Sequence, residues 1–364
     1  MAVWPGMYVR HRLDISVADI SFGVLSCGRR LRRKKVEAEI LRLCSLEEEG
    51  LVCFSVRSGW DLWLGAQGLR AGDEVLVSAI THPDMVRIIH EHGLRAVPVD
   101  IDPETLAPRP WMLEAALTPR TRVVLVAHLF GGRMDLGGVA KFARERGLLL
   151  VEDCAQAFQG PERMGDPAAD VSMYSFGTLK TSTALGGAVL RVRDREVLGR
   201  TRGKQASYPF QDRGGYLKKL LKVLGLLAVS RPRPYGLLAG ACTRLESDLD
   251  ALVNGVVRGF PPREPAATFF RRLSHRPSAP LLAMLSRRLR TFDRERLASS
   301  GERFASGLRE APAGRSLPTE ASLMMSGVVF LPVYPELPSQ AFDVMAELVN
   351  DCAARGAIGS VALS

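Results

Sequence analysis

Five apolar runs alternate with stretches of helical pattern between Leu51 and Asp153, and this alternation constrains the fold more than any other feature of the chain. The runs occupy 51–56, 74–80, 95–101, 122–129 and 148–153, and the helical stretches occupy 60–69, 84–93, 108–117 and 136–147. Strands separated by single helices predict a mostly parallel sheet with right-handed crossovers. Two further runs, 171–176 and 186–192, extend the sheet, and the last is expected to run in the opposite direction.

Polar residues stand where two of these runs end. The run 148–153 reads as a buried parallel strand that ends in Asp153, and the carboxyl ends of such strands form the edge where ligands bind. The run 171–176 contains Ser175, and Lys180 follows, 27 positions after Asp153. A lysine that forms a Schiff base and an aspartate that keeps a pyridine nitrogen protonated suit pyridoxal phosphate. Taken alone, each residue also has an ordinary interpretation, as a helix cap or a solvated charge.

The combined segment resembles the signature of the DegT/StrS-type sugar aminotransferases, a branch of the aspartate-aminotransferase-like (fold type I) enzymes. The resemblance lies in Glu152-Asp153-Cys154-Ala155-Gln156, then Ser175-Phe176-Gly177-Thr178-Leu179-Lys180, then Gly186-Gly187, and extends over 15–205. It implies a mostly parallel seven-stranded sheet sandwiched by helices, with a smaller C-terminal α/β domain. It also implies a homodimeric enzyme with active sites at the subunit interface. The unpaired spacing of the cysteines separately indicates a cytoplasmic protein. The enzyme that the resemblance implies uses pyridoxal 5'-phosphate to move an amino group, expected to come from glutamate, to a keto-sugar nucleotide.

The resemblance assigns roles to four residues of this segment and to His128. Lys180 is the catalytic residue, and Asp153 pairs with the pyridinium nitrogen. Gln156 reaches the ring near its phenolic oxygen, or is a polar residue of the first helical turn. Ser175 binds the phosphate, or is an ordinary serine at a strand end. His128 matches a family histidine and is expected to be a packing residue behind the site.

Further cofactor contacts are expected from two strand-to-helix turns. Gly59 and Trp60 are expected to offer backbone amides to the phosphate at the start of a helix, where Trp60 replaces the threonine of the family. His82 stands where the family places an aromatic ring on the pyridine face, and a surface-loop histidine is the alternative. Two other departures, Phe158 for a common histidine and Ser274 for an asparagine, suggest a different acceptor pocket.

The chain has 364 residues, enough for one large and one smaller domain, and a formal net charge of +10. The excess is local, because 191–310 holds 25 Lys and Arg against 11 Asp and Glu. No nucleic-acid-binding motif accompanies it, so an anionic substrate or a membrane surface is the expected partner. The six cysteines show no paired spacing, so neither a metal site nor disulfides are expected. The chain shows no apolar segment of membrane-spanning length, and its first residues do not read as a signal peptide.

Four regions are expected: an N-terminal helical segment (1–50), the core of the cofactor-binding domain (51–204), a basic helical insertion (205–276), and a long helix with the small C-terminal domain (277–364). In the insertion, Leu217, Leu220, Leu221 and Leu224 are expected to pack on the large domain, opposite Lys218, Lys219 and Lys222. The insertion is expected to lie beside the active-site mouth. Weak association with a membrane surface is the alternative.

Two other functions compete with the sugar aminotransferase. One is a transaminase that acts on a lipid-linked or non-sugar ketone at a membrane surface, and the other is a non-catalytic regulator that retains the fold. Lys180 argues against the dehydratase offshoot of the family, in which histidine replaces the lysine.

Overall fold

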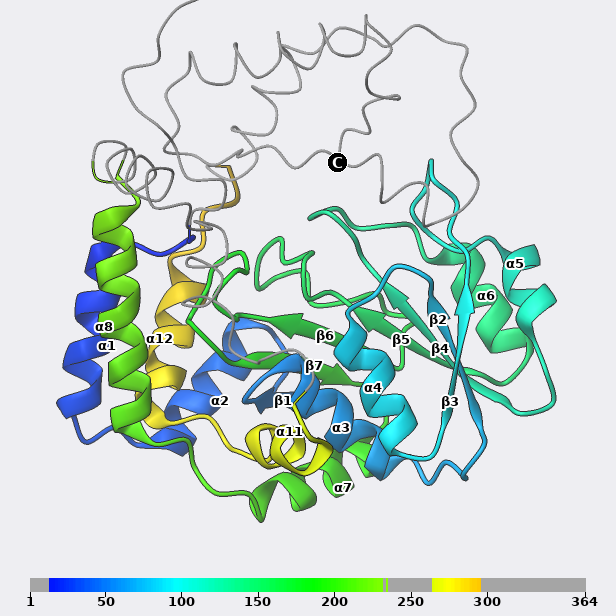
Figure 1. The fold of residues 1–364 in the computed structure, drawn as a ribbon, viewed down its shortest axis with the longest axis horizontal. Coiled ribbons are helices and arrows are strands. Elements are labelled where there is room, and N and C mark those ends of the chain that lie inside the picture. The colour runs from blue at the N-terminus through cyan, green and yellow to red at the C-terminus, as the bar shows by residue number, and fades with distance from the viewer. Residues whose placement is uncertain (1–12, 232–233, 235–263, 296–364) are drawn as a thin grey trace, which may run out of the picture. The chain divides into compact units, whose positions relative to one another are not determined.

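A computed structural model describes residues 13–231, 234 and 264–295. Its strands form a seven-stranded sheet with the order β1-β7-β6-β5-β4-β2-β3 (Figure 1). The strands are β1 (Gly50–Cys53), β2 (Glu74–Ser78), β3 (Arg95–Val99), β4 (Thr121–Ala127), β5 (Leu149–Asp153), β6 (Val171–Ser175) and β7 (Ala188–Val192). Each lies within or next to one of the apolar runs, which confirms the expected fold class.

The pairing of the strands also follows the sequence. β2 pairs in parallel with β3 and β4, and β4 pairs in parallel with β5. β7 is antiparallel to both β6 and β1, as expected for the strand after the Gly-Gly pair. Gly187 has a φ of +86°, which glycine adopts without strain where the chain turns into β7.

The described chain divides into two compact units. The second unit holds Arg70–Gly160 and Asp166–Ala169, with strands β2 to β5 and helices α4 (Pro83–Glu91), α5 (Pro110–Ala116) and α6 (Gly137–Glu145). Its core joins strand and helix side chains, among them Leu76, Val124, Leu113 and Phe142. β3 is the edge strand, with its Pro98 exposed, a position where a residue without an N–H group costs no ladder hydrogen bond.

The first unit holds the described residues up to Leu69, Pro161–Gly165 and Asp170–Phe292. Helices α3 (Val56–Ala66) and α7 (Arg195–Ala206) pack on β1 and β7, and α2 (Arg33–Leu43) packs against β1. A Cβ on Gly59 of α3 would lie 2.6 Å from the methyl carbons of Leu190 on β7. The glycine therefore lets α3 approach the sheet closely.

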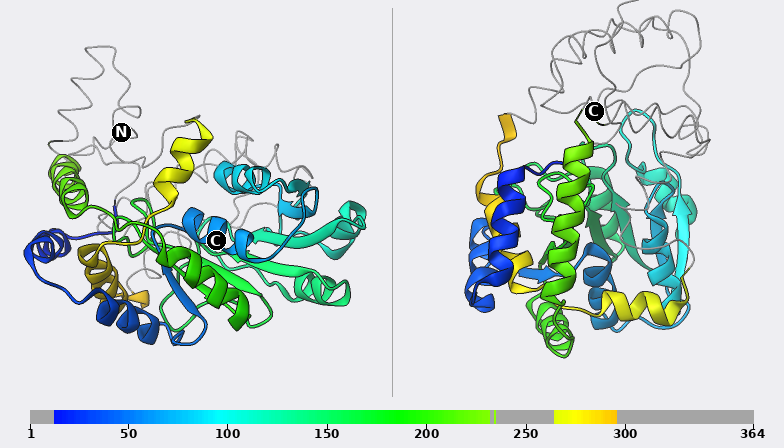
Figure 2. Two further views of the ribbon diagram at one scale, coloured as in Figure 1. Left: turned by 90° about the horizontal axis from the view of Figure 1, so that it is seen from below. Right: turned by 60° about the vertical axis from the view of Figure 1, so that its left-hand side comes forward.

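Three helices of the first unit pack side by side: α1 (Val17–Gly28), α8 (Arg213–Val229) and α12 (Ala279–Arg290) (Figures 1 and 2). α8 buries Tyr216, Leu220 and Val223 here. The sequence placed Leu221 and Leu224 on the packed face, and this was wrong, because they are 52% and 37% exposed. The buried face is set by contact with α1 and α12, and it is rotated away from the row of leucines.

Within this unit, the segment that enters α8 and the segment that enters α12 lie next to each other. The amide of Gln211 donates to the carbonyl of Arg276 at 2.9 Å, and Phe210 and Arg276 form an isolated parallel bridge. The hydroxyl of Ser278, the N-cap of α12, donates to the side-chain oxygen of Gln211 at 2.8 Å. Helix α11 (Ala266–Leu273) leads back to this point. The two ends of the segment from Gln211 to Ser278 are thus joined by hydrogen bonds.

Several expectations lie outside the described residues. They are the character of the first residues of the chain, most of the long helix expected at 292–308, and the strand and helix of the small domain at 327–333 and 340–356. Within the part of the chain that the structure describes, none of the helices combines the length and the hydropathy that a bilayer crossing needs.

Candidate active site

Lys180 lies in a tight loop between β6 and β7, in the first unit. Ser175 ends β6, and Lys180 follows it, half-buried, with its amide donating to the carbonyl of Gly177 at 3.1 Å. The hydroxyl oxygen of Ser175 accepts from the amide of Gly177 at 3.4 Å, which leaves the hydroxyl proton able to donate to an anion. The structure thus brings the predicted nucleophilic amine and a predicted phosphate donor into one turn.

The loop that carries Lys180 is held by main-chain and side-chain bonds. The carbonyl of Phe176 accepts from the amides of Ala184 and Gly186, and the hydroxyl of Thr183 donates to the carbonyl of Gly177 at 2.6 Å. Within the loop, Ser182 and Leu185 have φ values of +54° and +62°, in the left-handed region that non-glycine residues avoid. Because these conformations cost free energy, the surrounding hydrogen bonds are needed to fix the loop.

The start of α3 corrects the predicted phosphate contacts. The sequence placed the open amides at Gly59 and Trp60, but the amide of Gly59 already donates to the carbonyl of Ser55 at 3.0 Å inside the helix. Ser55 is the N-cap, and its hydroxyl accepts from the amide of Ser58 at 3.1 Å. The first turn, whose amides have no carbonyl one turn earlier in the helix, is therefore Val56–Ser58, three residues before the predicted position.

Trp60 is a core residue of α3. Its side chain is fully buried and stacks on Trp63 with 5.4 Å between ring centroids. Its place in the second turn of α3 puts its amide inside the helix, so the expected backbone contact with a phosphate does not hold for either Gly59 or Trp60.

Asp153, Gln156 and His82 belong to the second unit. Asp153 is the last residue of β5, is 6% exposed, and accepts from the amide of Ala155 at 2.9 Å through Oδ1. Gln156 is exposed in the turn that follows. His82 is the N-cap of α4, and its Nδ1 accepts from the amide of Asp84 at 3.1 Å. This cap fixes one ring edge of His82, and stacking of the ring on a cofactor stays a prediction.

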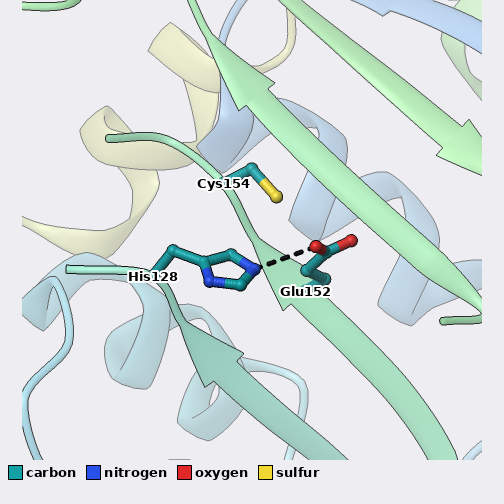
Figure 3. Close-up of side chains that lie close together, drawn as sticks. All are labelled: His128, Glu152 and Cys154. Carbon is teal, nitrogen blue, oxygen red and sulfur yellow. Dashed lines mark hydrogen bonds and ion pairs between the residues drawn. The ribbon is translucent and has the colours of Figure 1, made fainter. Parts of the chain in front are cut away.

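A buried ionic network lies directly behind Asp153, and the sequence did not reveal it. Glu152 is fully buried, and its Oε1 accepts from Nε2 of His128 at 2.9 Å (Figure 3). The same oxygen accepts from Nη2 of Arg133 at 2.9 Å. Its Oε2 accepts from the amide of Asp166 at 2.9 Å. The amide of Met134 donates to Nδ1 of His128 at 3.1 Å, so the proton of the neutral ring is on Nε2. A carboxylate in a buried strand needs such partners, and the pair Glu152-Asp153 at the strand end was the signal that could have indicated the network.

The same network brings Cys154 near His128 and Glu152, with their ligand atoms within 4.8 Å of one another (Figure 3). A metal ion would need a free lone pair on a ring nitrogen of His128. Nδ1 already accepts from the amide of Met134, and Nε2 carries the proton that it donates in the hydrogen bond to Glu152. The group therefore acts as a hydrogen-bonded support for the end of β5, the packing role expected for His128.

The two residues that depart from the expected pattern also have positions in the structure. Phe158 is buried. Ser274 is the C-cap of α11 and donates its amide to the carbonyl of Phe270 at 2.9 Å, next to Arg276, which lies over the ring of Phe210 with 3.9 Å to the centroid. Ser278 is the N-cap of the following helix, α12.

Comparison with known proteins gives one family. The model of the DegT/DnrJ/EryC1/StrS aminotransferase family matches residues 25–211, just over half of the chain. The chain is 37% identical over 148 residues to the L-glutamine:2-deoxy-scyllo-inosose aminotransferase of Streptomyces fradiae, covering 39% of this chain and 34% of that protein. It is 33% identical over 192 residues to the UDP-N-acetyl-3-dehydro-alpha-D-glucosamine 3-aminotransferase of Acidithiobacillus ferrooxidans, covering 51% and 49%.

Among solved structures, the aminotransferase TlmJ of Streptoalloteichus hindustanus has the same fold. Its TM-score is 0.63 at 22% identity, over 96% of this chain and all of that one. The sequence matches to the two curated relatives are shorter and span half or less of their lengths. The family match ends at residue 211, close to the first residue of α8.

Proposed function

Because the chain belongs to the DegT/DnrJ/EryC1/StrS aminotransferase family, we propose that it is a pyridoxal-phosphate-dependent aminotransferase. Its substrates are a keto-sugar nucleotide and an amino donor, glutamate in the first instance, and it works as a cytoplasmic homodimer. The single observation that carries the proposal is Lys180, presented half-buried in a braced loop beside the hydroxyl of Ser175. Relatives named for amination of a keto-inositol and of a keto-sugar nucleotide support the acceptor class.

The residues present fit the cofactor by their chemistry. The predicted set offers an amine, a hydroxyl and a buried carboxylate, the groups that an aldehyde, a phosphate and a pyridinium nitrogen each need. Ser175 and the first turn of α3 would bind the phosphate, and Asp153 would hold a proton at the ring nitrogen. When bound, pyridoxal phosphate supplies a ring that accepts electrons from the reacting carbon of the substrate.

The work of Lys180 follows from its position. Its Nζ would bind the cofactor aldehyde at rest and would carry a proton to and from the reacting carbon once the amino donor has displaced it. The network of Glu152, His128 and Arg133 would hold the end of β5, and with it Asp153, in a fixed orientation. His82 and Gln156 would contact the ring.

The test is to locate the cofactor on the chain. Protein reconstituted with pyridoxal phosphate should absorb in the visible range, and borohydride reduction followed by peptide mapping should place the label on Lys180. Lys180→Ala should remove both the absorbance and the amino transfer from glutamate or glutamine while the far-ultraviolet circular dichroism stays unchanged. Lys204→Ala, an exposed lysine of α7, is the control. A label on Lys204 or Lys141 would refute the assignment.

A second candidate keeps the cofactor and changes the location: the same chemistry on a lipid-linked or other ketone at a membrane surface. It is favoured by the face of α8 that exposes Leu221 and Leu224 beside the lysines Lys218 and Lys222. Co-sedimentation with phosphatidylserine vesicles at low salt should then fall in a Leu221/Leu224→Ser variant. Equal recovery of both proteins in the supernatant would leave only the first candidate.

A further inference from the structure

Helix α8 begins just beyond the residues that match the family, yet it reaches the loop that carries Lys180. The family match ends at residue 211, and α8 starts at Arg213. From its first turn, the hydroxyl of Tyr216 donates to the main-chain carbonyl of Ala184 at 2.9 Å, and the tyrosine is fully buried.

Ala184 lies in the loop that carries Lys180, so the bond from Tyr216 restrains that loop directly. Ala184 lies four residues after Lys180, between the two residues with left-handed backbone conformations, Ser182 and Leu185. Its amide donates to the carbonyl of Phe176 at 3.1 Å, so a single residue links the tyrosine to the turn that carries the lysine. A buried carbonyl that loses its donor costs more free energy than the bond itself contributes, so this contact resists loosening of the loop.

α8 also packs against α1 and α12. A Cβ on Gly23 of α1 would lie 2.6 Å from a methyl carbon of Met284 in α12 and 2.8 Å from one of Leu220 in α8, so the three helices meet at that glycine. α12 also contacts the loop, since its Arg288 carbonyl accepts from the hydroxyl of Ser182 at 3.0 Å. Burial raises the pKa of Tyr216 well above its usual value, so its hydroxyl remains a donor across the working pH range of an enzyme.

We propose that Tyr216 is a positioning residue for Lys180: through its bond to Ala184, helix α8 holds the lysine loop in the conformation that amino transfer requires. The role of the loop in catalysis rests on the function proposed above, whereas the mechanical coupling of α8 to the loop does not. The experiment therefore measures the catalytic role of the loop and the coupling of α8 to the loop separately.

The first measurement uses protein without cofactor, so that its result does not depend on the activity. In Tyr216→Phe, amide hydrogen exchange in the peptide 176–187 should be about fivefold faster than in the wild type, the effect of losing one hydrogen bond. Tyr174→Phe is the matched control, because Tyr174 is also a buried tyrosine whose hydroxyl donates to a main-chain carbonyl, that of Arg163 at 3.0 Å. Exchange in 176–187 that is unchanged in Tyr216→Phe, or that rises equally in both variants, would overturn the proposal.

The second measurement needs no variant and covers the case that Tyr216→Phe does not fold. In wild-type protein at rising, sub-denaturing urea, the amides of 176–187 and of 213–229 should open with the same urea dependence. Loop amides that open while α8 stays protected would overturn the proposal.

The third measurement uses the loaded enzyme. Tyr216→Phe should lower kcat several-fold with an unchanged KM for the amino donor, and it should shift the pH midpoint of the visible absorbance, because the lysine is held less firmly. If exchange responds as expected but no activity exists in the wild type, the proposed function fails and the coupling stands. If activity exists but kcat and the midpoint match the wild type, the coupling does not position Lys180.

Discussion

At the scale of single residues, the end of β5 places two carboxylates side by side with different surroundings. Successive side chains of a strand point to opposite faces of a sheet. Glu152 therefore meets His128, Arg133 and the amide of Asp166, whereas Asp153 accepts from the amide of Ala155. The two adjacent acids should respond to amide substitution in opposite ways.

For Asp153→Asn we expect nearly normal stability and a large loss of amino transfer. The amide keeps the size and an oxygen for the Ala155 contact, but it cannot stabilise a proton on the ring nitrogen by charge. Activity and urea denaturation measured on the same preparation check this. Near-normal turnover would mean that another group pairs with the pyridinium.

For Glu152→Gln we expect the reverse, a loss of about 1–3 kcal/mol in unfolding free energy, because one side-chain end becomes an NH₂ group that faces a donor. Whichever way the amide turns, either the main-chain N–H of Asp166 or the pair of His128 and Arg133 loses its acceptor. The urea midpoint of this variant should lie below that of Asp153→Asn. Equal midpoints would show that the network contributes little to stability.

At the scale of elements, the sequence predicted the strands better than the helix starts and faces. Apolar runs located all seven strands, because burial on both faces of a sheet leaves a plain record in composition. The start of α3 was missed because Ser55 and Val56 continue the run of β1, and the cap appears only in the spacing of Ser55 and Ser58. The packed face of α8 was missed because Tyr216 and Val223, with Leu220 from the predicted leucine row, meet the neighbouring helices, whereas Leu221 and Leu224 are exposed.

Lys219 gives a pH-dependent prediction for α8. Burial lowers its pKa from 10.5 to about 8, so the folded protein binds fewer protons than the unfolded chain between these pH values, and this group's contribution to stability rises with pH. Below pH 8 the buried charge costs free energy, so Lys219→Met should stabilise the protein. The gain should be larger at pH 7 than at pH 10, and Lys218→Met, at an exposed position, should show no such difference. A gain that is the same at both pH values would contradict the assignment.

At the scale of the whole molecule, the described cysteines report how tightly its parts pack. Cys27 is partly exposed, and Cys44, Cys53 and Cys154 are buried, with burial raising the pKa of Cys44 to about 12 and that of Cys53 further. Thiolates are the reactive form, so a maleimide at pH 7.5 should label Cys27 first and the other three only after denaturation. Peptide mapping over time gives the order. Early labelling of Cys154 would show that the end of β5 opens in the folded protein.

How much of the site the sequence could predict depends on the distance over which its residues act. Asp153, Ser175 and Lys180 follow from local motifs, and the structure places each at a strand end or in a turn. Arg133 and Tyr216 could not be predicted in the same way, because their partners lie 19 and 32 positions away and nothing in the local pattern selects them. Such contacts between residues that are distant in the sequence are seen only in the folded structure.

The hydrogen bonds that tie Gln211 to Arg276 and Ser278 also have a consequence for the gene. Because the chain departs and returns at the same place, a recombination event can lengthen or shorten the coding sequence between these points without redirecting α7 or α12. The segment from Gln211 to Arg276 could thus be exchanged as one unit, both in evolution and in the design of chimeras. Removal of the segment would also remove the tyrosine that donates to Ala184, so a change in the length of the gene at this point would affect the loop that carries Lys180.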